Sequence, residues 1–211
     1  DDQTIVEPTI TLGGPIMRDR LWFFGAYSPS TRDTDRTVTF LNGSTSTINQ
    51  EFVRQNWAGS LSGNLGSKLL FKASGNNSGY EETNILPGVD GRGNPNPAAY
   101  EGQTLERENW TFSGYADFIA SPEWYFSAKG GRYYDNLSQG GIPSDPYVWF
   151  AGGSPSVFPG IDPAIVRPAG FRTLTSNSAI TKDAYTRDSF DFDATWFPTF
   201  AGNHQIKAGV Q

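Results

Sequence analysis

Cysteine is missing from this chain of 211 residues, and histidine and methionine occur once each. Without cysteine there is no disulfide framework, no thiolate metal site and no cysteine nucleophile. Because His204 is the single histidine, a multi-histidine zinc site is excluded and most acid–base constellations lack their usual participant. We therefore expect no enzyme, no metal site and no cofactor.

Basic residues are scarce relative to acidic ones: 16 Lys and Arg stand against 22 Asp and Glu, which gives a net charge of −6. This balance argues against a nucleic-acid partner. Apolar residues make up only 36% of the chain, and none of their runs approaches the roughly 18 residues of a transmembrane helix. Aromatics nevertheless reach 14%, which argues against disorder.

Long helices are not expected, because 24 glycines and 14 prolines recur along the whole chain. A period of two is present instead. In residues 189–196, Phe190 and Phe192 point to one side of an extended chain, while Asp191 and Asp193 point to the other. This alternation predicts strands with one apolar and one polar face.

Counting such segments predicts about eight strands. They cover residues 9–16, 20–28, 52–65, 68–82, 107–120, 124–137, 187–197 and 204–211. Several run past the 5–6 residues usual in soluble strands and reach the roughly 9–11 of membrane strands. Short connections alternate with long ones at roughly 28–52, 83–106 and 138–187. Segment 36–41 reads either as a loop strand or as the extension of a neighbouring hairpin.

Alternating short turns and long loops are typical of an outer-membrane barrel. The polar faces are small or charged, which suits a wet lumen, and Trp22, Trp110, Trp124 and Trp196 lie near strand ends, where interfacial girdles occur. A soluble β-sandwich also alternates, with such aromatics in its core. The residues favour an antiparallel, up-and-down transmembrane barrel and leave the soluble fold open.

Residues 13–27, GGPIMRDRLWFFGAY, resemble a stretch early in the barrel of TonB-dependent outer-membrane receptors. The similarity is to the Oar-like type, which carries a carboxypeptidase-regulatory-like N-terminal domain. Residues 202–210, GNHQIKAGV, are similar to a hairpin that recurs further along such barrels. The family barrel has 22 strands and a plugged lumen.

The resemblance implies that residues 1–211 form part of such a barrel domain, about eight strands of the larger 22-stranded barrel. Residues 1–16 would be the plug-to-barrel junction and first strand, and residues 138–187 a long extracellular loop. The start at Asp1 without an initiator methionine, and the end at Gln211 inside an expected strand, also suggest a piece of something larger.

The implied function is energised import of a scarce, unidentified solute across the outer membrane of a Gram-negative bacterium. The chain would supply barrel wall, lumen lining and outer loops, with outer-membrane lipid as one partner. The TonB complex would act through a plug region that has no counterpart here. Two alternatives remain: a soluble or secreted β-rich binding module, for example for glycans, and a small eight-stranded outer-membrane barrel acting as an adhesin or structural protein.

Two groups of residues are candidates for solute contact. Aromatic and arginine side chains on the long loop are typical contact residues, and we single out Tyr147, Trp149 and Arg172, although packing within the loop also explains them.

The second group is polar and is expected to face the lumen: Lys72, Asp191 and Asp193. The two aspartates share one strand face. They could act as an acid pair or a cation site, but without a third partner a solvated lumen face is the better interpretation.

Overall fold

The structure, a computed structural model, describes residues 1–40, 43–89, 97, 100–141 and 182–211. These residues form one antiparallel sheet of ten strands. No helix among them is long and apolar enough to cross a membrane. The strands are β1 (Asp2–Val6), β2 (Ile10–Met17), β3 (Leu21–Tyr27), β4 (Ser30–Thr39), β5 (Thr45–Leu65), β6 (Leu69–Thr83), β7 (Thr104–Ser121), β8 (Trp124–Gly140), β9 (Lys182–Trp196) and β10 (Ile206–Val210).

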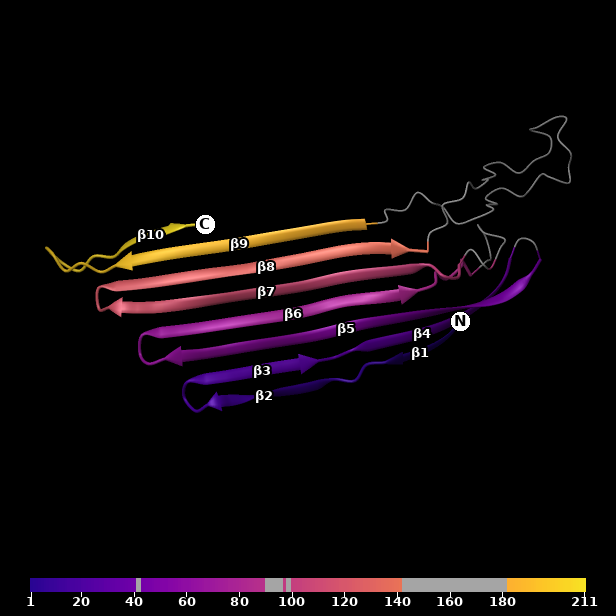
Figure 1. Ribbon diagram of the computed structural model, residues 1–211, viewed down its shortest axis with the longest axis horizontal. Coiled ribbons are helices and arrows are strands. Elements are labelled where there is room, and N and C mark those ends of the chain that lie inside the picture. Colours follow the sequence, from indigo (N-terminus) through magenta and orange to yellow (C-terminus); the bar gives the residue numbers. More distant parts are fainter. Residues whose placement is uncertain (41–42, 90–96, 98–99, 142–181) are drawn as a thin grey trace, which may run out of the picture.

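The ten strands occupy eight adjacent positions in the sheet, here called lines, because two of the positions are each shared by two consecutive strands. β3 and β4 both pair with β5 in one continuous register, in which Tyr27 lies opposite Trp57 and Ser30 opposite Arg54. β1 and β2 likewise form a single edge line beside β4 and β3. Each line pairs with the next in chain order, as Figure 1 shows. The predicted all-β, antiparallel, up-and-down arrangement is confirmed, but the sheet of the described residues is open, with β1–β2 and β10 at its edges.

The predicted long connection at 28–52 is wrong. β4 pairs with the first half of β5 over its whole length, so this region is a hairpin with its tip beyond Thr39. Polar side chains point to both of its faces, which hides the period of two, and cross-strand pairs such as the Thr37 and Thr47 hydroxyls, 2.7 Å apart, support it. Segment 36–41 is therefore largely an extension of a neighbouring hairpin, one of the two interpretations left open.

The other two long connections are shorter than predicted. β6 continues to Thr83 and β7 begins at Thr104, while β8 continues to Gly140 and β9 begins at Lys182. Most of the expected extracellular loop, residues 142–181, lies outside the described residues.

Successive tight turns are displaced in one direction. Leu21, just after the first turn, lies opposite Gly63, and β5 continues two residues further to Leu65 before its own turn. Leu69, just after that turn, lies opposite Phe118, and β7 continues three residues further. The turns form a staircase at the left of Figure 1. A stagger of constant sign is what tilted strands in a curved sheet produce.

Side chains on paired residues share a face of the sheet, so the registers divide the strands into two faces. The polar face carries, among others, Ser62, Lys72, Ser113, Lys129 and Asp191. On the opposite face, the half nearer the tight turns carries an apolar band. The band consists of the side chains that point to this face from residues 10–16, 21–27, 57–65, 69–75, 110–118, 124–130, 190–196 and 206–210.

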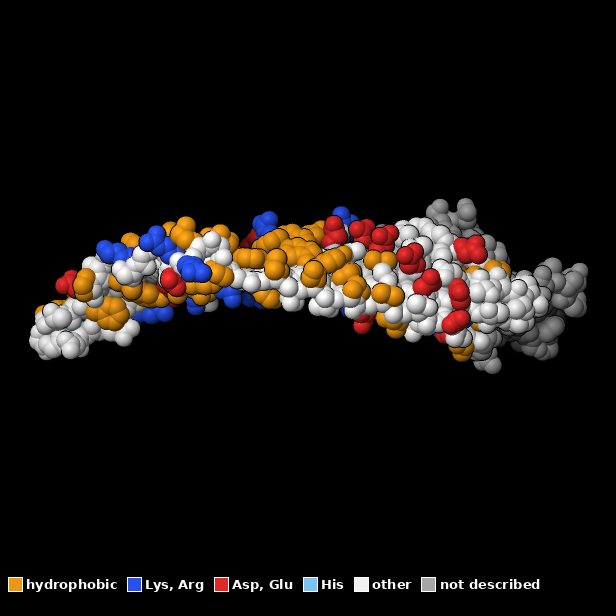
Figure 2. Space-filling model, turned by 90° about the horizontal axis from the view of Figure 1, so that it is seen from below, with side chains coloured by type: hydrophobic (Ala, Val, Ile, Leu, Met, Phe, Trp, Pro, Cys, Tyr) orange, Lys and Arg blue, Asp and Glu red, His pale blue; other side chains and the backbone are white. Residues whose placement is uncertain are grey.

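Among the described residues, the apolar band contains no charged side chain; the ion pair between Arg132 and Asp188 lies at its loop-side margin. Beyond that margin the same face carries an acidic collar. The collar consists of Asp33, Asp35, Glu51, Glu81, Glu106 and Glu108, all exposed. Figure 2, which views the sheet from its edge, shows hydrophobic side chains over the left and centre, with Lys and Arg side chains among them, and acidic side chains mainly toward the right.

A small hydrophobic core lies at the loop end. Ile48, 1% exposed, packs with Val38 and Phe40 of the β4–β5 hairpin and with Tyr100 of the connection between β6 and β7. This loop-end core holds the connection against the hairpin, and backbone hydrogen bonds within the connection close it, including one of 3.1 Å from the Ile85 amide to the Tyr100 carbonyl.

Candidate binding surface on the polar face

The structure places the predicted lumen-facing residues on one face. Lys72 lies opposite Tyr115, Tyr115 opposite Lys129, and Lys129 opposite Asp191, so one row crosses four strands. Asp193 follows two residues later on the same face. The other candidates, at positions 147, 149 and 172, lie outside the described residues.

The two aspartates are not an isolated acid pair. Asp193 forms an ion pair of 3.0 Å with Lys207 of β10, and Asp191 lies in register with Lys129. The part of the chain that the structure describes contains no group of three or more acidic or histidine side chains able to hold a metal ion. This end of the polar face is therefore a mixed-charge surface.

A second cluster on the polar face lies nearer the loops and was missed by sequence reasoning. We call it the arginine–aromatic cluster; it consists of Arg32 of β4, Phe52 and Arg54 of β5, Tyr80 of β6 and Arg107 of β7. The guanidinium carbon of Arg32 lies 4.8 Å from the Phe52 ring centre. That of Arg54 lies 5.2 Å from the Phe52 centre and 5.6 Å from the Tyr80 centre. The two rings are 5.2 Å apart.

Register builds this cluster. Arg54 lies opposite Tyr80, and Tyr80 opposite Arg107, while Arg32 lies opposite Phe52 in the next row of the same face. The members are 20 or more positions apart along the chain except within β5. A single sequence does not supply the pairing that brings them together.

Within the cluster, Arg107 is neutralised by its neighbour. Its guanidinium donates two hydrogen bonds to the Asp135 carboxylate, of 2.6 and 2.8 Å. These bonds hold the pKa of Asp135 below its usual value, against the opposing effect of burial, and they raise the pKa of Arg107. Arg107 therefore offers little free charge to a ligand.

Arg32 and Arg54 differ from Arg107 in this respect. Neither has an acidic partner within ion-pair distance among the described residues, and Nε of Arg54 is buried without a hydrogen-bond acceptor. The nearby carboxylate of Glu82, opposite Phe52, accepts a 2.7 Å hydrogen bond from Gln50 instead. Arg32 on β4 and Arg54 on β5 are thus two half-buried cations, and neither forms an ion pair with a described carboxylate.

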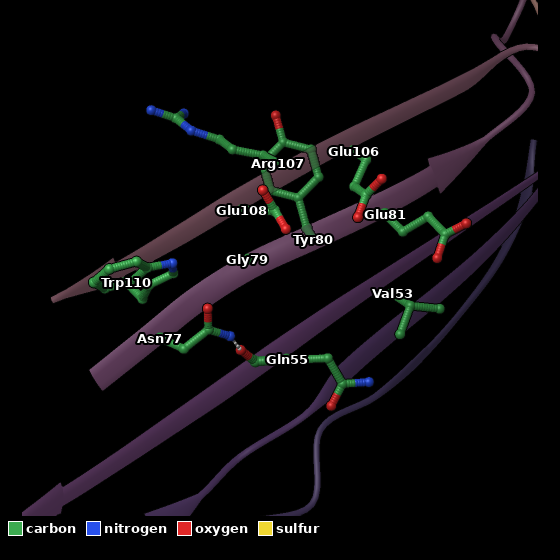
Figure 3. Close-up of a pocket in the computed structure, with 10 residues that line it drawn as sticks. All are labelled: Val53, Gln55, Asn77, Gly79, Tyr80, Glu81, Glu106, Arg107, Glu108 and Trp110. Atoms are coloured by element: carbon green, nitrogen blue, oxygen red, sulfur yellow. Dashed lines mark hydrogen bonds between the residues drawn. The ribbon is translucent and has the colours of Figure 1, made fainter. Parts of the chain in front are cut away.

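A groove of about 270 Å³ lies where the pairing of β6 with β7 is interrupted (Figure 3). Of its ten lining residues only Tyr80 and Arg107 point to the polar face, and the other eight point to the opposite face. Gly79 allows the two strands to approach here, because a Cβ at this position would lie only 2.7 Å from the Arg107 carbonyl oxygen. Asn77 closes the other end by donating a 2.7 Å hydrogen bond to the Gln55 carbonyl, dashed in the figure.

Comparison of the chain with protein-family models, with curated proteins and with solved structures finds no match. The functional interpretation therefore rests on the two faces of the sheet and the residues they display.

Proposed function

We propose that this chain is a wall segment of a membrane-spanning β-barrel. The observation that carries the proposal is the apolar band, which continues across the sheet from β2 to β10 while many of its side chains remain exposed. Leu12 is 68% exposed, Leu65 64% and Phe190 60%. Soluble proteins rarely display apolar patches beyond a few hundred Å². Lipid on this face and water on the polar face supply the environment that each requires.

The dimensions of the band fit a bilayer. Along β5 it extends from Trp57 to Leu65, which at about 3.4 Å per residue is about 27 Å along the strand and about 19–22 Å in height at the 35–45° tilt of barrel strands. Outer-membrane barrels carry an apolar band about 25 Å tall. Trp57 and Trp110 lie at its loop-side edge, and Trp124 and Trp196, whose rings are 5.8 Å apart, at its turn-side edge. Aromatic girdles occupy these two positions in such barrels.

The stagger of the strands supports a barrel further. Between β5 and β9 the loop-side edge of the band moves from Trp57 to Phe190, which lies in the row of Leu61. This displacement has the same direction as that of the tight turns. A band that keeps a constant height on tilted strands must shift in register from strand to strand, and closure of a barrel requires that tilt.

Within this proposal, the resemblance of residues 13–27 and 202–210 favours a TonB-dependent receptor. The segment would contribute wall, lumen lining and outer loops to the energised import of a solute through the outer membrane, and energy would reach the solute through the plug and the TonB complex.

The soluble alternative requires a second layer of structure over the apolar band. The described strands all belong to one sheet, so none of them forms such a layer. The small eight-stranded barrel requires β1–β2 to pair with β10, which the described strands do not do.

Matched arginine substitutions test the barrel. Leu61→Arg places a charge in the centre of the apolar band, and Ser62→Arg places it on the polar face of the same strand. A charge on the lipid face costs about 2–4 kcal/mol at the bilayer midplane, whereas lumen positions tolerate charge. In the full-length protein expressed in a Gram-negative host, we expect Leu61→Arg to reduce outer-membrane assembly strongly, and Ser62→Arg to leave it close to normal.

Assembly is measured by membrane fractionation and by the heat-dependent shift of folded barrels in gel electrophoresis. Equal assembly of both variants, or recovery of the unsubstituted protein in the soluble fraction, would overturn the barrel. Receptor identity is tested separately by co-purification with the periplasmic domain of TonB. Failure of that step alone would remove the receptor assignment and leave the barrel.

A further inference from the structure

We infer that Arg32 and Arg54 of the arginine–aromatic cluster form a docking site for an oxyanion, namely a carboxylate or phosphate group of a solute. The inference deepens the proposed function and rests on it, since the polar face serves transport only if it lines a lumen.

Four arginines of β4, β5 and β7 point to the polar face. Arg36 pairs with Asp1 at 2.6 Å, and Arg107 pairs with Asp135 at the same distance. The remaining two, Arg32 and Arg54, have no such partner among the described residues. On this face, aspartates therefore neutralise Arg36 and Arg107. The two unpaired ones flank the same ring, that of Phe52.

Two unpaired cations near one ring repel each other, and a bound anion removes that repulsion. A guanidinium that stacks on a ring by its flat face keeps the N–H donors in its plane available for hydrogen bonds. Guanidinium donors match carboxylate and phosphate oxygens in a bidentate geometry that a lysine does not provide.

The site is also preorganised. Its members stand on paired strands, not on loops, and the ring centres of Phe52 and Tyr80 lie 5.2 Å apart beneath the Arg54 guanidinium. Both arginine side chains are half-buried, so part of their conformational entropy is lost before a ligand arrives. Nε of Arg54, buried without an acceptor, is a donor that the protein itself leaves unsatisfied.

Binding of two defined probes tests the inference. Citrate, a tricarboxylate, and inorganic pyrophosphate are titrated calorimetrically at low salt into the purified, full-length protein in detergent micelles. At least one probe should bind, and the stronger of the two identifies carboxylate or phosphate as the preferred group. Arg32→Gln and Arg54→Gln should each raise the dissociation constant about tenfold, which is the effect of losing a charged hydrogen-bonding partner.

Arg132→Gln is the matched control, because Arg132 lies on the opposite face, paired with Asp188. This substitution should change the dissociation constant of the probe by no more than about twofold, which is the change expected from net charge alone at a distant exposed site. Arg54→Lys separates geometry from charge: it keeps the cation but should still weaken binding severalfold, because ammonium lacks the paired donors. All variants are first shown to be folded by their heat-dependent gel shift.

Absence of binding of both probes to the folded, membrane-inserted protein would overturn this inference and leave the barrel intact. Equal losses from Arg54→Gln and Arg132→Gln would also overturn it, since general electrostatic attraction would then explain the binding. Failure of the unsubstituted protein to enter the outer membrane is a different result, and it would remove the proposed function instead.

Discussion

The ring of Phe112 fills the space that the missing side chain of Gly75, its partner on the neighbouring strand, leaves open. A Cβ at position 75 would lie 2.6 Å from an atom of this ring, so the two positions are complementary in size. The Trp57 ring, on β5, lies on the other side of Gly75, and its centre is 6.0 Å from that of the Phe112 ring. Aromatic side chains that cover cross-strand glycines stabilise β-sheets in this way.

Replacing this glycine should therefore be costly. Gly75→Ala forces the half-exposed Phe112 ring out of its position, and we expect it to reduce the free energy of unfolding by about 0.5–1.5 kcal/mol, the cost of a displaced rotamer. Gly59→Ala, in the same row, is the control, since its Cβ would meet nothing closer than 3.7 Å. Urea unfolding of the protein in lipid vesicles measures both. Equal effects of the two substitutions would contradict the size complementarity.

The ion pair between Arg107 and Asp135 predicts a dependence of stability on pH. These residues lie beyond the apolar band on the loop side, and Arg107 holds the pKa of Asp135 below its usual value. The contribution of the pair is thus complete above the ordinary aspartate pKa of about 4 and is lost as the pH falls through the lowered value.

Asp135→Asn removes this dependence. Between pH 5 and the acid limit of folding, the unsubstituted protein should lose about 0.5 kcal/mol more stability than the variant, a small amount because the pair is only partly buried. Chemical unfolding at a series of pH values provides the measurement. Parallel pH profiles of the two proteins would show that Asp135 is not ion-paired in the folded state.

The loop-end core predicts local stability in the connection between β6 and β7. Ile48→Ala should cost about 2–4 kcal/mol, because the side chain is 1% exposed and its removal leaves a cavity. Hydrogen exchange at the Asn84 and Ile85 amides, which donate to carbonyls of Gln103 and Tyr100, should then become more than tenfold faster.

Thr47→Ser is the control for that experiment, since Thr47 is exposed and points to the opposite face of the same strand, and serine keeps the hydroxyl that contacts Thr37. It should leave exchange at these amides unchanged. If Ile48→Ala leaves it unchanged as well, the connection is not held by this core.

The strands that could be predicted were those with one apolar face. Residues 124–137 were expected as a strand and lie within β8, because Trp124, Phe126 and Ala128 alternate with polar residues. The β4–β5 hairpin could not be predicted in the same way. One of its faces carries Thr, Asp and Asn, and the other mixes polar residues such as Arg36 and Gln50 with Val38 and Ile48, so no continuous apolar face identifies the strands.

The candidate site shows the same limit. Asp191 and Asp193 stood out because both are charged and two positions apart on one strand. Arg32 and Arg54 did not, because each is a single cation in a polar segment and their meeting at Phe52 depends on the register of β4 with β5. Local pattern identifies a face of a strand, whereas pairing decides which faces lie side by side.

Spin labelling along β5 tests the central claim, that the apolar band faces lipid and the polar face faces water. Residues 1–211 contain no cysteine, so a cysteine introduced into β5 places one label in this segment, and any cysteine elsewhere in the full-length protein is first replaced with serine. In lipid vesicles, labels at Leu61→Cys and Leu65→Cys should be accessible to dissolved oxygen. Labels at Ser60→Cys and Ser62→Cys should be accessible to a water-soluble nickel complex, so that accessibility alternates with a period of two. Water exposure of both sets, or shielding of positions 61 and 65 from oxygen by a second protein layer, would contradict the account.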